Sequence, residues 1–194
     1  LYIPAGELKV MPRIIAALQA ARAGLDAFLA RGGLVYASGS SGAVLSRELR
    51  RLDGAVHVGL GLLPILCHER EAVYGDDLWF RLPDGLEVIG CQIQVMDTYL
   101  EQANAYLGEV IYGQGNAGDS TEGARLGRVL FSNCLGPLLV KNPRFAARLI
   151  KEALTEYDAA ANPRRALGLG AEAGLRADDL ELEDASAVLI RRFI

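Results

Sequence analysis

The sequence predicts an α/β protein, a three-layer sandwich in which helices cover a mixed, mostly parallel sheet. Two observations predict it. In the first quarter of the chain, short apolar runs of strand length alternate with helical segments, a pattern typical of parallel sheets. A strand-rich stretch follows in the middle of the chain. The 194 residues fit one domain, and a hydrophobic content of 51% is enough for a core.

The amino-terminal elements follow from the spacing of apolar residues. Residues 1–4 have the composition of a buried strand. Residues 10–29 form an alanine-rich stretch with apolar residues at helical spacing, so we expect one long helix there. Two glycines end it, and residues 34–38 are the next expected strand. A second helix is expected from about residue 42 to residue 51.

The rest of the chain contains shorter candidates. Strands are expected at residues 65–67, 77–81, 86–91, 110–112 and 129–131. Asn142 followed by Pro143 predicts the start of a helix that continues to about residue 157, since both residues are typical of a helix N-terminus. We expect the domain to cover residues 1–160. Residues 161–194 would be a C-terminal extension that ends in VLIRRFI, a strand or a short amphipathic helix.

Composition excludes several classes of function. Twenty Lys and Arg against 24 Asp and Glu give a net charge of −4, so we expect no nucleic-acid partner. No apolar run reaches the ~18 residues of a membrane span. Three cysteines without a close pair indicate a reduced, cytoplasmic protein. No metal-ligand spacing is present, and we expect neither a metal nor another cofactor.

Three segments carry a resemblance to a known family. RGGLVYASGSSGAVLSREL spans residues 31–49, YGQGNAGDSTEGARLG residues 112–127, and GPLLVKNP residues 136–143. Together they resemble class I (triad-type) glutamine amidotransferases. The resemblance is closest to the glutaminase subunit of lipid II isoglutaminyl synthase, which works with a Mur-ligase-like partner on a peptidoglycan precursor. Cobyric acid synthase-like glutaminases are more distantly similar. The resemblance implies a flavodoxin-like fold.

The family places a βαβ-like segment before the strand that residues 1–4 resemble. The sequence starts at that strand and without Met. Two alternatives stay open: the chain is an N-terminally truncated fragment, or its sheet is smaller than that of its relatives.

The resemblance also implies which positions would carry glutaminase chemistry. In the family, a cysteine at the apex of the strand–turn–helix elbow attacks the glutamine amide, and a histidine shuttles the proton. The cysteine position is Gly39 here, and the histidine position is Leu135, which cannot accept a proton. The two histidines of the chain, His57 and His68, are expected to be solvated surface residues. Both halves of the dyad are therefore replaced.

Three further positions would bind substrate in the family. Gly6 lies in what remains of the loop that holds the oxyanion, and Ser40 follows the elbow apex. Asp97 stands where a cationic residue would hold the substrate carboxylate, so its charge has the wrong sign. Loss of several parts of one mechanism together argues against glutaminase chemistry.

Other nucleophiles are the main alternative to catalytic loss. Ser38, Ser40 or Cys134 would need a base, and only a lysine such as Lys9 or Lys141 remains. Small hydroxylated residues are also ordinary material for turns and helix caps, and a Cys134 side chain that faces away from the elbow would be buried and inert. We favour these plainer interpretations.

The loop GQGNAGDSTEGAR has two interpretations. Its four glycines in thirteen positions indicate a loop held by its own hydrogen bonds, and it forms either a structured surface loop or the rim of a partner interface. Three functions follow: a degenerate, non-catalytic subunit in a heteromer with a Mur-ligase-like protein, an active subunit that supplies ammonia to a ligase, or a different hydrolase. In the first, the apolar residues 188–194 would add an anchor for the partner.

Overall fold

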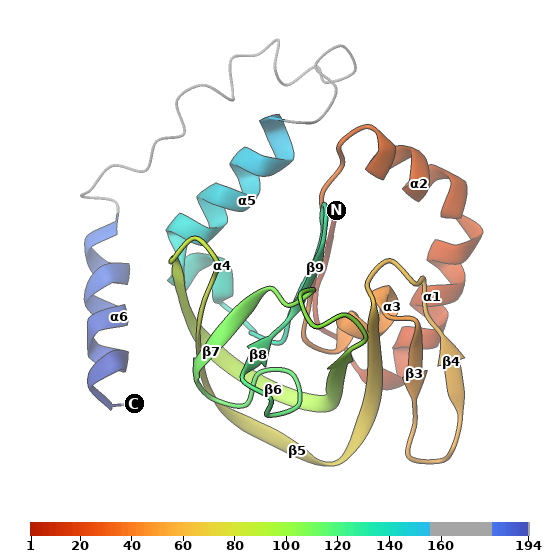
Figure 1. The fold of residues 1–194 in the computed structure, drawn as a ribbon, viewed down its shortest axis with the longest axis horizontal. Coiled ribbons are helices and arrows are strands. Elements are labelled where there is room, and N and C mark those ends of the chain that lie inside the picture. Colours follow the sequence, from red (N-terminus) through yellow and green to blue (C-terminus); the bar gives the residue numbers. More distant parts are fainter. Residues whose placement is uncertain (156–179, 194) are drawn as a thin grey trace.

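The computed structural model describes residues 1–155 and 180–193, which form a mixed α/β fold built on two mixed sheets (Figure 1). The four-stranded sheet has the order β1-β2-β10-β9. Its strands are β1 (Tyr2–Ile3), β2 (Val35–Ser38), β10 (Val129–Ser132) and β9 (Ala124–Leu126). The first three are parallel and β9 is antiparallel. The expected strands at residues 34–38 and 129–131 are confirmed. The expected domain boundary at residues 160 and 161 lies outside the described residues.

The strand-rich middle forms a second sheet. Its strands are β3 (Glu48–Arg50), β4 (Val56–Val58), β5 (Ile65–Arg81), β6 (Glu87–Leu100), β7 (Gly108–Tyr112) and β8 (Thr121–Glu122). The β3–β5 pair is parallel and all other pairs are antiparallel. The mostly parallel character that the sequence predicts therefore holds for the four-stranded sheet alone. The reason is the β5–β6 hairpin, because strands joined by a short turn pair antiparallel.

Two expected helices differ from the structure. Instead of one helix over residues 10–29, the chain forms η1 (Leu8–Val10), α1 (Met11–Ala20) and α2 (Arg22–Ala30), with a break at Ala21. The helix expected at residues 42–51 is the single turn α3 (Gly42–Leu45), which follows η2 (Gly39–Ser41). The Ser46 hydroxyl is hydrogen bonded to the Ala43 and Glu48 carbonyl oxygens at the exit of α3. The chain then enters β3.

The carboxyl-terminal helices are α4 (Leu138–Lys141), α5 (Pro143–Thr155) and α6 (Glu181–Phe193). The backbone carbonyl of Asn142 accepts the Ala146 N–H at 2.9 Å, so the expected start of α5 is confirmed. The Asn142 side chain does not cap the helix; it bonds the N–H and C=O of Ile89 in β6. For the last segment, α6 confirms the helical alternative. No helix among the described residues is long and apolar enough to span a membrane.

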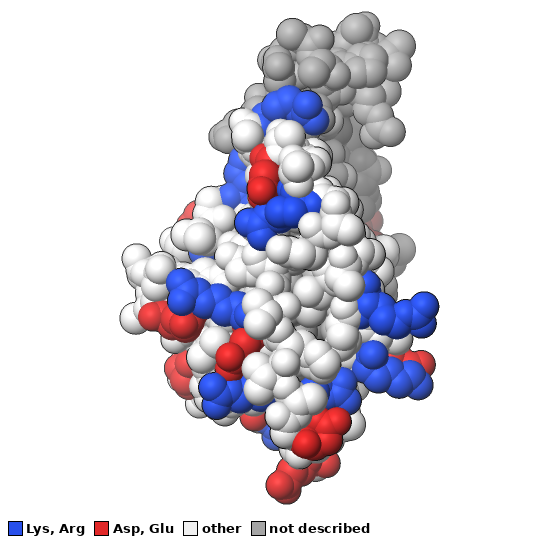
Figure 2. Space-filling model, turned by 90° about the vertical axis from the view of Figure 1, so that its right-hand side faces the viewer, with Lys and Arg blue, Asp and Glu red and all other residues white. Residues whose placement is uncertain are grey.

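Helices cover both faces of the four-stranded sheet. Val35, Ala37 and Phe131 pack in one cluster with the buried residues of α1 and α2. Tyr36 and Leu130, which alternate with them, pack in a second cluster with residues of α5. This alternation follows from the two-residue period of a strand. On the outside, α1, α2 and β4 present a face with few charged side chains across its middle (Figure 2), and the exposed positions of α1 and α2 are mostly alanine.

Candidate functional site

The elbow after β2 has the geometry that the sequence predicts. The strand ends at Ser38, Gly39 takes a φ of +55°, and the one-turn helix η2 leads into α3. A residue with a side chain pays a steric cost in this left-handed region, whereas glycine does not. A sharp, strained turn between a strand and a helix is the arrangement that exposes a nucleophile in enzymes with such an elbow. Here the apex has no side chain.

Leu135 lies against the apex of the elbow. A Cβ atom built on Gly39 would be 2.6 Å from Leu135 Cδ2 and 3.0 Å from the Cβ of Ala5, both inside van der Waals contact. The Leu135 backbone is held by its N–H, which donates to the Cys91 carbonyl oxygen at 2.7 Å. The predicted proximity of Leu135 to Gly39 is confirmed. Their roles as the family's nucleophile and histidine positions stay a prediction.

The loop after β1 is bonded to the elbow. The Gly6 N–H donates to Ser40 Oγ at 3.1 Å, and the same hydroxyl donates to the Gly6 carbonyl oxygen. Ser41 Oγ donates to the Pro4 carbonyl oxygen next to it. The Gly6 N–H, which the resemblance would direct at an oxyanion, is thus already occupied. The structure thus brings the two predicted substrate-binding residues Gly6 and Ser40 together, but they are hydrogen bonded to each other.

Little empty space remains beside the elbow. A cavity of about 10 Å³ lies next to the elbow, whereas a single water needs roughly 10–15 Å³. Its lining residues come from the elbow, from β6 and from the loop after β10: Gly39, Ser40, Ile93, Gln94, Val95, Met96 and Asn133. A glutamine substrate does not fit without movement of these side chains.

Asp97 lies on β6 and is already paired within the protein. Its carboxylate forms an ion pair with Arg70 on β5, and Gln114 Nε2 lies 3.4 Å from Asp97 Oδ1. Neither Asp97 nor Arg70 lines the cavity at the elbow. The positive charge of Arg70 is therefore neutralised by Asp97 within the sheet.

His68 is not the solvated surface residue that the sequence predicts. It is half-buried and its ring packs against that of Tyr99 at an angle of 49°, with 4.8 Å between the ring centroids. His68 is paired with Asp97 across the hairpin, whereas Leu135 bridges to Cys91, six residues away on β6. His68 is not among the residues that line the cavity at the elbow.

The other candidate nucleophiles are occupied or buried. Ser38 Oγ is hydrogen bonded to the Tyr2 hydroxyl at 2.9 Å. Cys134 is buried, which raises the pKa of its thiol well above the usual range, and Glu122 adds to the effect. Lys9 is exposed and forms an ion pair of 2.6 Å with Glu7, so it activates neither. Lys141 lowers the pKa of the Cys134 thiol, but this effect is smaller than those of burial and Glu122, which raise it.

The glycine-rich loop of residues 113–125 is held in place by buried side-chain amides that the sequence did not predict. Gln92 Oε1 accepts the N–H groups of Gln114 and Gly115, at 3.1 and 3.2 Å. Gln94 Nε2 donates to the carbonyl oxygens of Gly115 and Asn116. Both glutamines are almost fully buried on one face of β6. Two polar residues at alternating positions of a strand were the only sequence signal for this contact.

A second part of the network links the loop to β10. The buried Glu122 carboxylate accepts from the Ser132 hydroxyl at 2.7 Å and from the Asn133 N–H at 2.8 Å. Asn133 Nδ2 also bonds Asn116 Oδ1 at 2.9 Å. Burial raises the pKa of Glu122, although these hydrogen bonds counteract it. The contacts favour a structured loop that positions the segment before Leu135, and the interface role stays a prediction.

Comparisons with known proteins show the fold. No family model and no curated protein matches the chain. Among solved structures, the crystal structure of a glutamine amidotransferase is similar, with a TM-score of 0.57 at 20% sequence identity. The match covers 79% of this chain and 78% of that chain. The chain therefore has a glutamine amidotransferase-like fold. Within residues 1–155 and 180–193, no group of three or more His, Cys, Asp and Glu could hold a metal ion.

Proposed function

We propose that this chain is a degenerate glutamine amidotransferase-like subunit that does not hydrolyse glutamine. The observation that carries the proposal is the contact between Gly39 and Leu135, where a nucleophile and its base would have to face each other. The cavity of about 10 Å³ beside them supports it, because a substrate amide has no room there. The bond between Gly6 and Ser40 supports it further, since it occupies the N–H that would stabilise an oxyanion.

The proposed role is that of a binding subunit in the cytoplasm. Its partner would be a Mur-ligase-like protein that amidates the peptidoglycan precursor lipid II or acts in a related cell-wall process. In the family the glutaminase works only beside a synthetase, so the fold carries a docking surface as well as a pocket. A docking surface does not need the nucleophile, so it can remain when catalysis is lost. The four-stranded sheet and the helices on its two faces would form the α/β sandwich that the family shares.

Catalytic loss is tested by ammonia release and by covalent labelling. The chain, alone and with its partner, is incubated with glutamine and separately with a glutamine-analogue electrophile that alkylates active-site cysteines. We expect no ammonia above the level of a heat-unfolded sample and no stoichiometric adduct. Mass spectrometry locates any adduct, and a Cys91→Ser variant controls for reaction at that half-buried thiol. Catalytic ammonia release would instead favour an active subunit of a lipid II isoglutaminyl synthase or of a cobyric acid synthase-type ligase.

Partner binding is tested by co-expression with the Mur-ligase-like protein, followed by size-exclusion chromatography with light scattering. We expect one species with the summed mass of both chains. Leu189 on α6 is 54% exposed and belongs to the apolar segment proposed as an anchor, so Leu189→Asp should weaken the complex. The matched control is Val58→Asp on β4, which is 76% exposed and lies outside α6. Separate elution of both wild-type proteins at micromolar concentration would reject a stable heteromer.

A further inference from the structure

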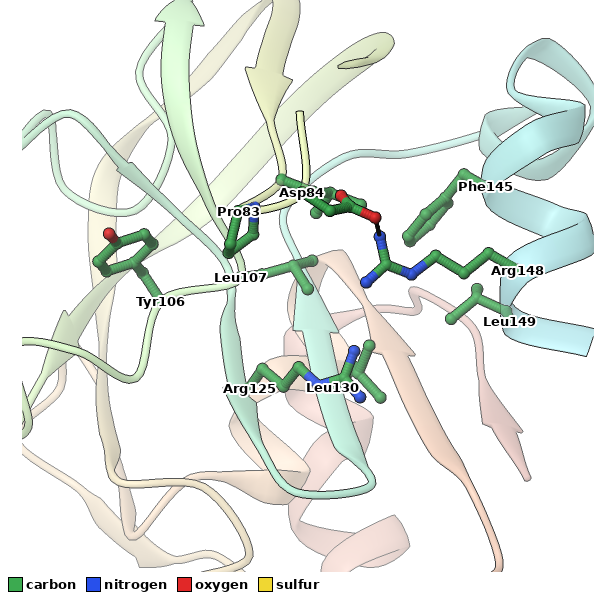
Figure 3. Close-up of a pocket in the computed structure, with 10 residues that line it drawn as sticks. Pro83, Asp84, Tyr106, Leu107, Arg125, Leu130, Phe145, Arg148 and Leu149 are labelled. Atoms are coloured by element: carbon green, nitrogen blue, oxygen red, sulfur yellow. Dashed lines mark hydrogen bonds and ion pairs between the residues drawn. The ribbon is translucent and has the colours of Figure 1, made fainter. Parts of the chain in front are cut away.

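The structure contains a second, larger cavity that the proposed function does not use. It has a volume of about 410 Å³ and lies between α5, the turn that joins β5 to β6, and strands β9 and β10 (Figure 3). Volumes of this size are typical of small-molecule sites. We propose that this cavity binds an amphipathic anion, a small molecule with an apolar body and one carboxylate or similar acidic group.

The floor of the cavity is apolar and is built from separate parts of the chain. Its members belong to one buried cluster: Leu82, Leu107, Leu130, Phe145 and Leu149. All five residues are more than nine-tenths buried, and Leu130 and Phe145 are only 1% exposed. A wall of this kind favours an alkyl or aromatic body through the area that binding removes from water.

Two guanidinium groups border this floor. Arg148 reaches from α5 and Arg125 extends from β9, where it lies directly opposite Leu130 in the β9–β10 pair (Figure 3). The lining residues thus include two cations and one anion, Asp84. Guanidinium groups bind carboxylates in a two-pronged geometry, which makes an anionic head group the matching chemistry.

Both arginines keep donors available for a ligand. Among the described residues, Arg148 uses Nη1 for its ion pair with Asp84, and Arg125 uses Nε and Nη2 for Gly127 and Glu152. A guanidinium has five N–H donors, so others remain. The side chains of Asp84 and Arg148 are 53% and 35% exposed, and ion pairs in contact with water are weak. A ligand carboxylate can therefore compete with Asp84 for Arg148.

The site is separate from the elbow. The cavity lies on the α5 side of the four-stranded sheet, whereas α3 follows the elbow onto the side of α1. No residue in the part of the chain that the structure describes lines both cavities. The proposal consequently does not depend on whether the elbow is catalytic, and its failure would leave the proposed function untouched.

Binding is tested with the whole chain and with probes of defined chemistry. Anilinonaphthalene sulfonate, an aromatic anion, serves as the fluorescent reporter, and decanoate as the competitor. Decanol lacks the charge and acetate lacks the apolar body, so the two controls separate the parts of the recognition. We expect saturable reporter binding that decanoate reverses about tenfold more effectively than decanol, in keeping with a charge-assisted hydrogen bond. Equal displacement by decanol and decanoate, or no saturable binding, would overturn the proposal.

Variants locate the binding site. Arg148→Gln and Arg125→Gln should each weaken the displacement by decanoate by about tenfold. The matched control is Arg81→Gln, which breaks a surface ion pair with Glu87 outside the cavity. Asp84→Asn should change the affinity in the opposite direction and strengthen decanoate binding, an effect that partial unfolding would not produce. Unchanged affinity in both arginine variants, or weaker binding in Asp84→Asn, would refute the assignment.

Discussion

Gly39→Ala measures how tightly the elbow is filled. The new methyl group would meet Leu135 Cδ2 at 2.6 Å and Ala5 Cβ at 3.0 Å, and its backbone would be held at a φ of +55°. The left-handed backbone costs a residue with a Cβ about 1–2 kcal/mol. Overpacking adds about 1–3 kcal/mol, because Leu135 has to move. We expect the free energy of unfolding to fall by about 2–5 kcal/mol.

Two matched variants separate these contributions. Gly54 has a φ of +86°, and a Cβ atom on it would have nothing within 4 Å, so Gly54→Ala should show the backbone cost of about 1–2 kcal/mol alone. In the double variant Gly39→Ala with Leu135→Ala, the clash with Leu135 is removed, and the backbone cost and the close contact with Ala5 should remain beyond the cost of Leu135→Ala. The coupling between the two positions should thus be about 1–3 kcal/mol.

Urea unfolding, followed by circular dichroism and extrapolated linearly, measures all four variants under the same conditions. The reasoning fails if Gly39→Ala costs no more than Gly54→Ala. It fails equally if the Gly39 and Leu135 substitutions are additive, because two residues in contact should be coupled. In either case Leu135 would not fill the apex, and the main support for catalytic loss would be gone.

Three further outcomes are expected. Burial raises the pKa of Glu122, so the folded state holds the proton of this carboxyl more tightly than the unfolded state does. The free energy of unfolding should therefore fall as the pH rises from the usual glutamate range through the raised pKa. Glu122→Gln should flatten this pH dependence in urea unfolding curves. Native thiol labelling read by mass spectrometry should modify Cys91 first, since Cys67 and Cys134 are buried and burial raises the pKa of Cys67 to about 12. Asn142→Ala removes two hydrogen bonds to Ile89 in β6 and a third to the Leu138 carbonyl oxygen in α4, and should cost about 1–3 kcal/mol in thermal or urea unfolding. Asn104→Ala on the exposed surface should cost little.

The sequence predicted the parts of the fold that rest on local signals. The four-stranded sheet was visible because β2 and β10 are buried on both faces and read as short apolar runs. The length of β5 was not visible, because its middle around residues 69–77 is charged and exposed on both sides, and so lacks the alternation that marks a half-buried strand. Only its ends were recognised as strands.

Only part of the candidate site could likewise be predicted from the sequence. The position of Leu135 beside Gly39 was predictable from the order of two motifs, since both follow parallel neighbouring strands that end at one edge of the sheet. The prediction for His68 was wrong because its charged sequence neighbours give no sign of Tyr99, whose ring packs against it from the partner strand. The buried hydrogen bonds of Glu122 join β8 to the end of β10 and the loop after it, and such contacts leave no periodic pattern in the sequence.

The order of the strands in the four-stranded sheet bears on how the chain folds. Val35 pairs with Val129, so this sheet closes a loop of about 90 residues, whereas β5 and β6 are joined by a short turn. Contacts of low sequence separation form at a smaller entropic cost, so we expect the hairpin to form first and the parallel strands to join last. During synthesis, β2 would leave the ribosome long before β10 and keep its apolar faces uncovered until then. The centre of the finished domain is thus the last part to become protected from hydrogen exchange.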